Sequence, residues 1–169
     1  MRYEGKLYRA LNPVYAREPL SGRGAALHGG RFNPRGLPAL YASLAVTTAI
    51  KEANQAGTLQ PTMLVSYEAE IAKVFDSRDE AALEPFRMST AGLADPGWRD
   101  RMKERGKAPT QIFAEVLVEQ GFHALLVRSF ARGASDDDLN LVLWRWEEKA
   151  PSRLILIDDE GRLAPIELT

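Results

Sequence analysis

Apolar positions along the chain fall into seven short runs that are typical of β-strands. Each run is rich in Leu, Val, Ile, Ala or aromatic residues and is bounded by turn residues, a composition that strands favour. No run approaches the length that crosses a membrane. The predicted strands cover residues 6–11, 39–42, 62–69, 73–76, 124–129, 139–146 and 153–158.

A different spacing, with apolar residues three and four positions apart, predicts a helix that begins at Ser43 and stops at Gly57. At roughly 100° per residue, Glu52 falls at the border of its apolar face, whereas Lys51 and Gln55 point to water. We therefore expect the Glu52 carboxylate to be half buried and directed along the sheet. The apolar face consists of Ala45, Val46, Ala49, Ile50, Ala53 and Ala56.

Two further helices are predicted in the second half of the chain, over residues 95–106 and 109–120. An Asp-Pro pair suits the start of the first helix, and Gly121 suits the end of the second. Strand and helix signals do not alternate regularly, so a mixed or antiparallel sheet flanked by helices is favoured over a doubly wound parallel sheet. We expect an α+β fold, a mixed α/β arrangement in which residues 1–169 form a single domain.

Composition and charge exclude several functional classes. The 22 basic and 23 acidic residues leave a formal net charge of -1, which creates no overall field that favours nucleic acid or an anionic membrane. The chain has no cysteine and two histidines, so disulfides, thiol catalysis and a zinc site are not expected. The charged start is not followed by the apolar stretch of a signal peptide, and we expect a cytoplasmic protein that holds no metal.

The segment 12–38 is rich in glycine and proline and has no sustained periodicity, which predicts a long loop that binds something. It contains neither a P-loop nor the GxGxxG dinucleotide motif. Cationic and donor side chains lie among its glycines: Arg23, His28, Gly29, Gly30, Arg31, Asn33 and Arg35. This cluster suits a pyrophosphate, because glycine permits close approach and Arg presents a planar fork to phosphate oxygens. From the cluster alone, a solvated basic loop with an internal ion pair is an equally good interpretation.

Three other side chains have the chemistry to complete such a site. Glu52 can stabilise the oxocarbenium-like state that forms when an N-glycosidic bond breaks, and it can hold a ribose hydroxyl. Tyr41 lies between the Gly-rich loop and the helix that carries Glu52, and Ser129 ends a predicted strand. Taken one by one, these residues are better explained as a strand aromatic, an ion-paired helix-border Glu and a strand-end serine. Together they predict phosphate donors, a ring and a carboxylate at one strand–helix corner.

Some other features carry less chemistry. The three aspartates at 136–138 lack the spacing of a calcium loop, and we expect residues 132–138 to form a solvated, mobile loop. A serine-hydrolase triad is unsupported because the GxSxG motif is absent. Trp98 and Met102 on the charged helix either pack against the core or meet a partner, and the sequence leaves both open.

The sequence resembles the RES domain, a family named for its Arg, Glu and Ser. The resemblance lies in Glu52, Ser129 and three motifs, which are Leu7-Tyr8-Arg9, Gly29-Gly30-Arg31-Phe32-Asn33 and Tyr41-Ala42-Ser43. The resemblance extends over most of the chain. The spacing of Arg31, Tyr41 and Glu52 is more specific than any one of these residues. Proteins of this family resemble toxins of bacterial type II toxin–antitoxin pairs, with a fold related to ADP-ribosyltransferases of the diphtheria-toxin and poly-ADP-ribose-polymerase kind.

The resemblance implies NAD+ as substrate. The NAD+ is either degraded, with water or phosphate as acceptor, or used to transfer ADP-ribose to a target protein. The implied partner is an antitoxin with an Xre-like helix-turn-helix that covers the NAD+ pocket, and no direct contact with nucleic acid or membrane is expected.

The resemblance also implies roles for single residues. Arg31 holds the NAD+ phosphate or ribose, Tyr41 stacks on or orients the nicotinamide, and Glu52 acts at the ribose. Further residues implied to support the site are Ser129, Arg9 for a phosphate contact and, as a weaker structural candidate, Asn140.

Two other functions stay open on the sequence. Arg and Lys near aromatic residues, in the Gly-rich loop and in Trp98-Arg99-Asp100-Arg101, are compatible with a toxin or regulator that binds or cuts RNA. The near-neutral net charge weighs against this reading. The third function is a catalytically inert module that only binds a partner. Three measurements distinguish these functions. An NAD+-consuming toxin releases nicotinamide, an RNA-binding protein binds RNA in a salt-dependent way, and an inert module is not thermally stabilised by NAD+.

Overall fold

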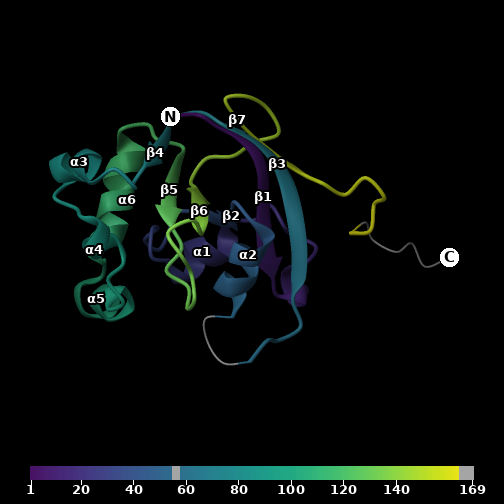
Figure 1. Ribbon diagram of the computed structural model, residues 1–169, viewed down its shortest axis with the longest axis horizontal. Coiled ribbons are helices and arrows are strands. Elements are labelled where there is room, and N and C mark those ends of the chain that lie inside the picture. The colour runs from purple at the N-terminus through teal and green to yellow at the C-terminus, as the bar shows by residue number, and fades with distance from the viewer. Residues whose placement is uncertain (55–57, 164–169) are drawn as a thin grey trace.

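Seven strands form one sheet in the computed structural model, which describes residues 1–54 and 58–163 (Figure 1). The strand order is β4-β5-β6-β2-β1-β3-β7. Strands β4 and β5 run parallel, and every other neighbouring pair in the described ranges is antiparallel. The expected mixed, largely antiparallel sheet is therefore confirmed. The strands are β1 (Tyr3–Leu11), β2 (Leu40–Ser43), β3 (Met63–Ile71), β4 (Val74–Asp76), β5 (Ala124–Arg128), β6 (Leu139–Leu143) and β7 (Ser152–Leu156).

Helices flank this sheet in two groups. Figure 1 shows α3 to α6 gathered beside β4 and β5, while α1 and α2 lie near β2 and β1. Within the described ranges, no helix is long and apolar enough to span a bilayer. The helices are α1 (Arg23–His28), α2 (Val46–Ala53), α3 (Glu80–Leu83), α4 (Thr90–Leu93), α5 (Trp98–Arg105) and α6 (Pro109–Glu119), with 3-10 turns η1 (Pro13–Tyr15) and η2 (Glu84–Phe86).

Each predicted strand overlaps one observed strand, and the predicted helices at 95–106 and 109–120 correspond to α5 and α6. The short helices α1, α3 and α4 were not predicted. They contain six, four and four residues, which is too short for a hydrophobic period to show. The segment 12–38 is therefore less irregular than expected, because it contains η1 and α1.

Helix α2 differs from the prediction in its start and in its buried face. It begins at Val46, and Ser43 closes strand β2 instead of capping the helix. The side chains it buries are Thr48 and Ala49, whereas Ile50 is 37% exposed. The predicted buried face is wrong by part of a turn, because Thr48 is buried and its hydroxyl donates a hydrogen bond to the buried carboxylate of Asp138. Glu52 is half-buried, as expected. The predicted positions of Gln55, Ala56 and Gly57 lie outside the described residues.

Two hydrophobic clusters bury the two faces of the sheet. The first takes side chains from all seven strands, including Leu126 of β5. The second takes Leu125 and Val127 from the opposite face of the same strand and packs them against α3, α4 and α6. Strand β5 is therefore covered on both sides, which explains why it reads as an unbroken apolar run.

The sheet is joined weakly at its centre. Strands β1 and β3 pair along their whole length, from Tyr3↔Ile71 to Leu11↔Met63. Strands β1 and β2 share a single register pair, Tyr8↔Ser43. The sheet therefore consists of two halves, β4-β5-β6-β2 and β1-β3-β7, that meet at one point.

Candidate active site

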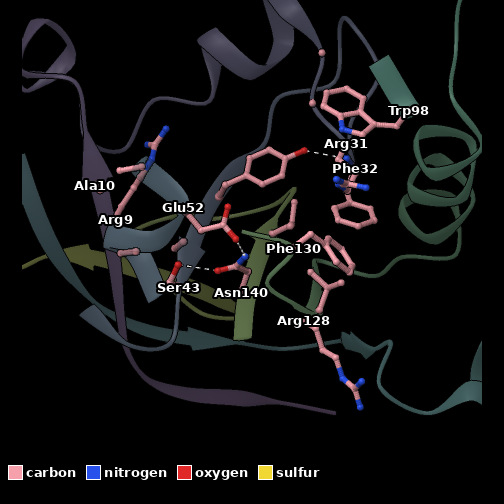
Figure 2. A pocket seen from close by; sticks show the side chains of 18 of the residues that line it. Arg9, Ala10, Arg31, Phe32, Ser43, Glu52, Trp98, Arg128, Phe130 and Asn140 are labelled. Atoms are coloured by element: carbon pink, nitrogen blue, oxygen red, sulfur yellow. Dashed lines mark hydrogen bonds between the residues drawn. The ribbon is translucent and has the colours of Figure 1, made fainter. Parts of the chain in front are cut away.

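A cavity of about 620 Å³ opens where the two halves of the sheet meet. It takes residues from β1 and β2, from the Gly-rich turn at 28–32 and from helices α2 and α5. Among the described lining residues, Glu52 is the one carboxylate (Figure 2). The cavity thus brings together the predicted residues Arg9, Arg31, Tyr41 and Glu52. The Arg and Lys residues that line it are Arg9, Arg31, Arg99, Lys103 and Arg128.

The Gly29–Asn33 turn forms one corner of the cavity. Backbone hydrogen bonds join Gly30 and Asn33 in both directions, with N···O distances of 2.9 and 3.3 Å. A Cβ at Gly30 would lie 2.4 Å from the Tyr41 hydroxyl oxygen and 2.5 Å from Asn33 Oδ1. Gly29 has φ +74°, a conformation that side chains rarely adopt. Both glycines are therefore required by the shape of the turn.

Buried amide side chains hold this turn from within. Asn33 is fully buried, and its Nδ2 donates to the carbonyls of Ala25 and Leu37 at 2.9 Å each. Gln111, at the start of α6, is also fully buried and donates from Nε2 to the Gly30 carbonyl at 2.9 Å. Gln111 was not predicted as part of the site, because it lies 81 residues from Gly30 in the chain.

Tyr41 contributes its ring to the cavity and its hydroxyl to the turn. The hydroxyl donates to Asn33 Oδ1 at 2.7 Å and accepts from the Phe32 N–H at 3.0 Å. Burial raises the pKa of Tyr41 far above its ordinary value, so the group stays protonated. The hydroxyl is already engaged, and what Tyr41 offers a ligand is the face or edge of its ring.

Arg31 is built into the wall of the cavity. Its Nη1 donates to the carbonyls of Leu93 and Asp95, at 3.1 and 2.7 Å, and so fastens the connection between α4 and α5. Its guanidinium carbon lies 4.8 Å from the ring centroid of Phe130 and 5.9 Å from that of Trp98. Burial, and then the nearby Arg99, lower the pKa of Arg31 from its ordinary value. Arg31 therefore positions α5 in addition to placing positive charge beside the cavity.

Helix α5 forms a wall that was left undecided on the sequence. Trp98, Arg99, Met102 and Lys103 all line the cavity. The Arg99 guanidinium carbon lies 4.6 Å from the Trp98 ring centroid. Trp98 is buried, so it packs inward as well as bordering the cavity.

The opposite corner holds Glu52. Ser129 Oγ and Asn140 Nδ2 both donate to Glu52 Oε1, each at 2.5 Å. The Ser43 hydroxyl in turn donates to Asn140 Oδ1 at 2.7 Å, and Figure 2 shows this chain from Ser43 through Asn140 to Glu52. Ser129 is buried, and the predicted serine contacts Glu52 directly through its hydrogen bond.

A second carboxylate, Asp138, fixes the backbone around Glu52. It accepts hydrogen bonds from Thr48 Oγ1 at 2.6 Å, Lys51 Nζ at 2.9 Å and the Ser135 N–H at 2.7 Å. The Ser135 N–H, followed by Thr48 and Lys51, holds the pKa of Asp138 far below its ordinary value. The Asp138 carbonyl also accepts the Ser129 N–H at 2.7 Å.

These contacts correct two expectations. The loop over 132–138 was expected to be solvated and mobile; residues 132, 133 and 135–137 are exposed, but Asp138 is buried and ties the end of the loop to α2. Lys51 was expected to point to water, yet its ammonium pairs with Asp138. Both errors have one cause: a charge run resembles a solvated loop unless its partners on another element are known.

Arg9 reaches the cavity from β1, the other half of the sheet. It lines the cavity, and its Nη1 donates to the Pro19 carbonyl at 3.3 Å. The predicted cation is thus present on the far wall from Arg31. The described residues contain no group of three or more His, Asp or Glu side chains arranged to hold a metal ion.

Comparison with known proteins identifies a family and a solved structure with a similar fold. Residues 6–165 match the family model described as RES domain. A chain in the crystal structure of the M. tuberculosis MbcT–MbcA toxin–antitoxin complex has a similar fold, with a TM-score of 0.66 and 20% sequence identity. The match covers 94% of this chain and 84% of that chain. No curated protein matches the chain. At 20% identity, the structural likeness shows a common fold.

Proposed function

This chain belongs to the RES domain family, and on that premise we propose that it is the toxin of a toxin–antitoxin pair that binds NAD+ and breaks its nicotinamide–ribose bond. One observation carries the proposal. A single carboxylate, Glu52, accepts hydrogen bonds from Ser129 and Asn140 in a cavity where five Arg and Lys residues also line the wall. This combination suits a substrate that has a pyrophosphate and a bond whose cleavage develops positive charge.

The cavity has the size and charge for a dinucleotide. Its volume of about 620 Å³ falls within the usual range for small-molecule sites, roughly 300–1,000 Å³. Arg9 on one wall and Arg99 and Lys103 on the other supply cations for the pyrophosphate. The Tyr41 ring, whose hydroxyl is engaged by the turn, is a rigid surface on which the nicotinamide ring can stack.

Glu52 acts on the bond that breaks. The electron pair of the bond between the ribose C1′ and the nicotinamide nitrogen leaves with nicotinamide, which becomes neutral, and positive charge develops on the ribose. The Glu52 carboxylate stabilises that charge, as carboxylates do in glycoside cleavage. An acceptor oxygen or nitrogen then bonds to C1′ and loses its proton. The acceptor is a protein side chain, water or phosphate, so the product is an ADP-ribosylated protein, ADP-ribose or a phosphorylated ADP-ribose.

We further propose that an antitoxin with an Xre-like helix-turn-helix binds this chain and covers the cavity mouth. The solved structure with the similar fold is a toxin–antitoxin complex, which supports such a partner. If the antitoxin covers the mouth, it should inhibit nicotinamide release in competition with NAD+.

Nicotinamide release from NAD+ by the purified chain tests the proposal. We expect release by the wild type, and a loss in kcat of about 10²-fold or more in Glu52→Gln, which keeps the shape but removes the charge. Glu119→Gln, at the exposed end of α6, is the matched control and should keep wild-type activity. Full activity in Glu52→Gln would refute the role of Glu52. Labelled NAD+ in lysate then shows whether the acceptor is a protein, since label reaches a protein band only if a protein is modified.

A further inference from the structure

We propose that Asn140 and Ser43 are positioning residues that orient the Glu52 carboxylate for catalysis. This inference rests on the proposed function, because it concerns the residue that acts on the bond. It assigns roles to an asparagine that the sequence marks as a structural candidate and to a serine that the sequence places in a helix cap.

The sheet itself sets the two residues side by side. Ser43 ends β2 and Asn140 lies near the start of β6, and they are direct partners in the antiparallel register. Directly opposed residues of neighbouring strands present their side chains on the same face of the sheet. Because Glu52 comes from α2 on that face, the three side chains meet in a row.

The chemistry of the groups determines which of them donates and which accepts in each hydrogen bond of this row. An ionised carboxylate only accepts hydrogen bonds, so Asn140 must present its NH2 to Glu52 and turn its carbonyl oxygen the other way. Ser43 is buried, and its hydroxyl donates to that carbonyl oxygen at 2.7 Å. Ser43 therefore stabilises the one amide orientation in which Asn140 can donate to Glu52.

The geometry matters because two donors converge on one oxygen. Ser129 and Asn140 both donate to Oε1, from different strand ends of the same half-sheet. Hydrogen bonds to a charged group are stronger than neutral ones, and two of them from fixed positions define the plane of the carboxylate. Both donors belong to the half-sheet β4-β5-β6-β2, whereas Arg9 of the other half-sheet donates to the Pro19 carbonyl.

The test compares Asn140→Asp, Ser43→Ala and a control, Ser66→Ala on β3. Asn140→Asp replaces the donor with a second carboxylate beside Glu52, so the acid limb of the pH–activity profile should move up by about one unit or more. At neutral pH, kcat should fall about 100-fold while KM for NAD+ changes less than about threefold. Ser43→Ala should lower kcat about five- to tenfold. Ser66→Ala should match the wild type. A melting-temperature shift in Asn140→Asp with unchanged kcat and pH profile would mean a purely structural role and would overturn the proposal.

A spectroscopic measurement separates this inference from the proposed function. The Asn140 side-chain amide is assigned in a 1H–15N spectrum by its absence in Asn140→Asp. Its resonances should move in Glu52→Gln and in Ser43→Ala, and stay in place in Ser66→Ala; unmoved resonances in the first two would overturn the row of contacts whatever the activity. A wild type without turnover would overturn the proposed function and the catalytic part of this inference. An active wild type whose Asn140→Asp variant keeps kcat and pH profile would overturn the inference alone.

Discussion

The two corners of the cavity are built in opposite ways. The Gly29–Asn33 turn is held by neutral groups, chiefly backbone and the side chains of Asn33, Tyr41 and Gln111. The Glu52 corner is held by hydrogen bonds to charged carboxylates, from Ser129 to Glu52 and from Thr48 and Lys51 to Asp138.

The difference indicates that the turn depends on close packing and the carboxylate corner on orientation and charge. In the turn, close packing leaves no room for an added methyl group, so changes there should act mainly on folding. At the carboxylates, orientation and charge decide, so changes should act mainly on catalysis and on the dependence on pH.

The largest effect on stability is expected from Gly30→Ala. The added Cβ would overlap the Tyr41 hydroxyl and Asn33 Oδ1 and break the hydrogen bond between them. We expect the free energy of unfolding to fall by about 3 kcal/mol, measured by urea denaturation. Gly24→Ala is the matched control, because a Cβ there meets nothing within 4 Å and Gly24 lies in α1. The control should be neutral or slightly stabilising. Equal stability of both variants would contradict the close-packed turn.

A smaller effect is expected from Tyr41→Phe, which divides the role of the hydroxyl from that of the ring. The Phe32 N–H and Asn33 Oδ1 lose their hydrogen-bond partner, so the free energy of unfolding should fall by about 1.5 kcal/mol. Because the ring remains, KM for NAD+ should stay within about threefold of the wild type.

Tyr41→Leu is the companion variant, since it removes both ring and hydroxyl. It should lose the same stability or more and also raise KM about tenfold. If Phe and Leu raise KM alike, the hydroxyl and not the ring meets the substrate.

The smallest effect is expected on the pH dependence of the free energy of unfolding, to which Asp138 at the carboxylate corner contributes. The folded-state pKa of Asp138 is depressed, so its contribution to stability is present above the unfolded-state pKa of about 3.9 and is lost as pH falls below it. The free energy of unfolding should therefore decline below about pH 4, and Asp138→Asn should reduce that decline. Asp136→Asn is the control, because Asp136 is 84% exposed and should keep the wild-type slope. An identical slope in both variants would remove Asp138 as the source.

Much of the fold follows from local patterns. The strands were predictable because apolar runs bounded by turn residues fold as strands in most contexts, and each of them overlaps an observed strand. The buried face of α2 was not predictable, since Thr48 is buried by a hydrogen bond to Asp138, 90 residues away in the chain. The spacing of apolar residues in a helix carries no information about a hydrogen-bond partner on another element.

The sequence by itself determined the strands, the Gly-rich turn and the family, because these depend on residues close together in the chain or on motif spacing. It also brought Arg31, Tyr41 and Glu52 to one predicted corner. Only the tertiary structure decided what surrounds them. Gln111, Ser43 and the α5 wall join the site through contacts between distant segments, and Glu52 meets Ser129 and Asn140 across 77 and 88 residues. Hydrogen-bond direction and burial are set by that packing, and no local pattern encodes them.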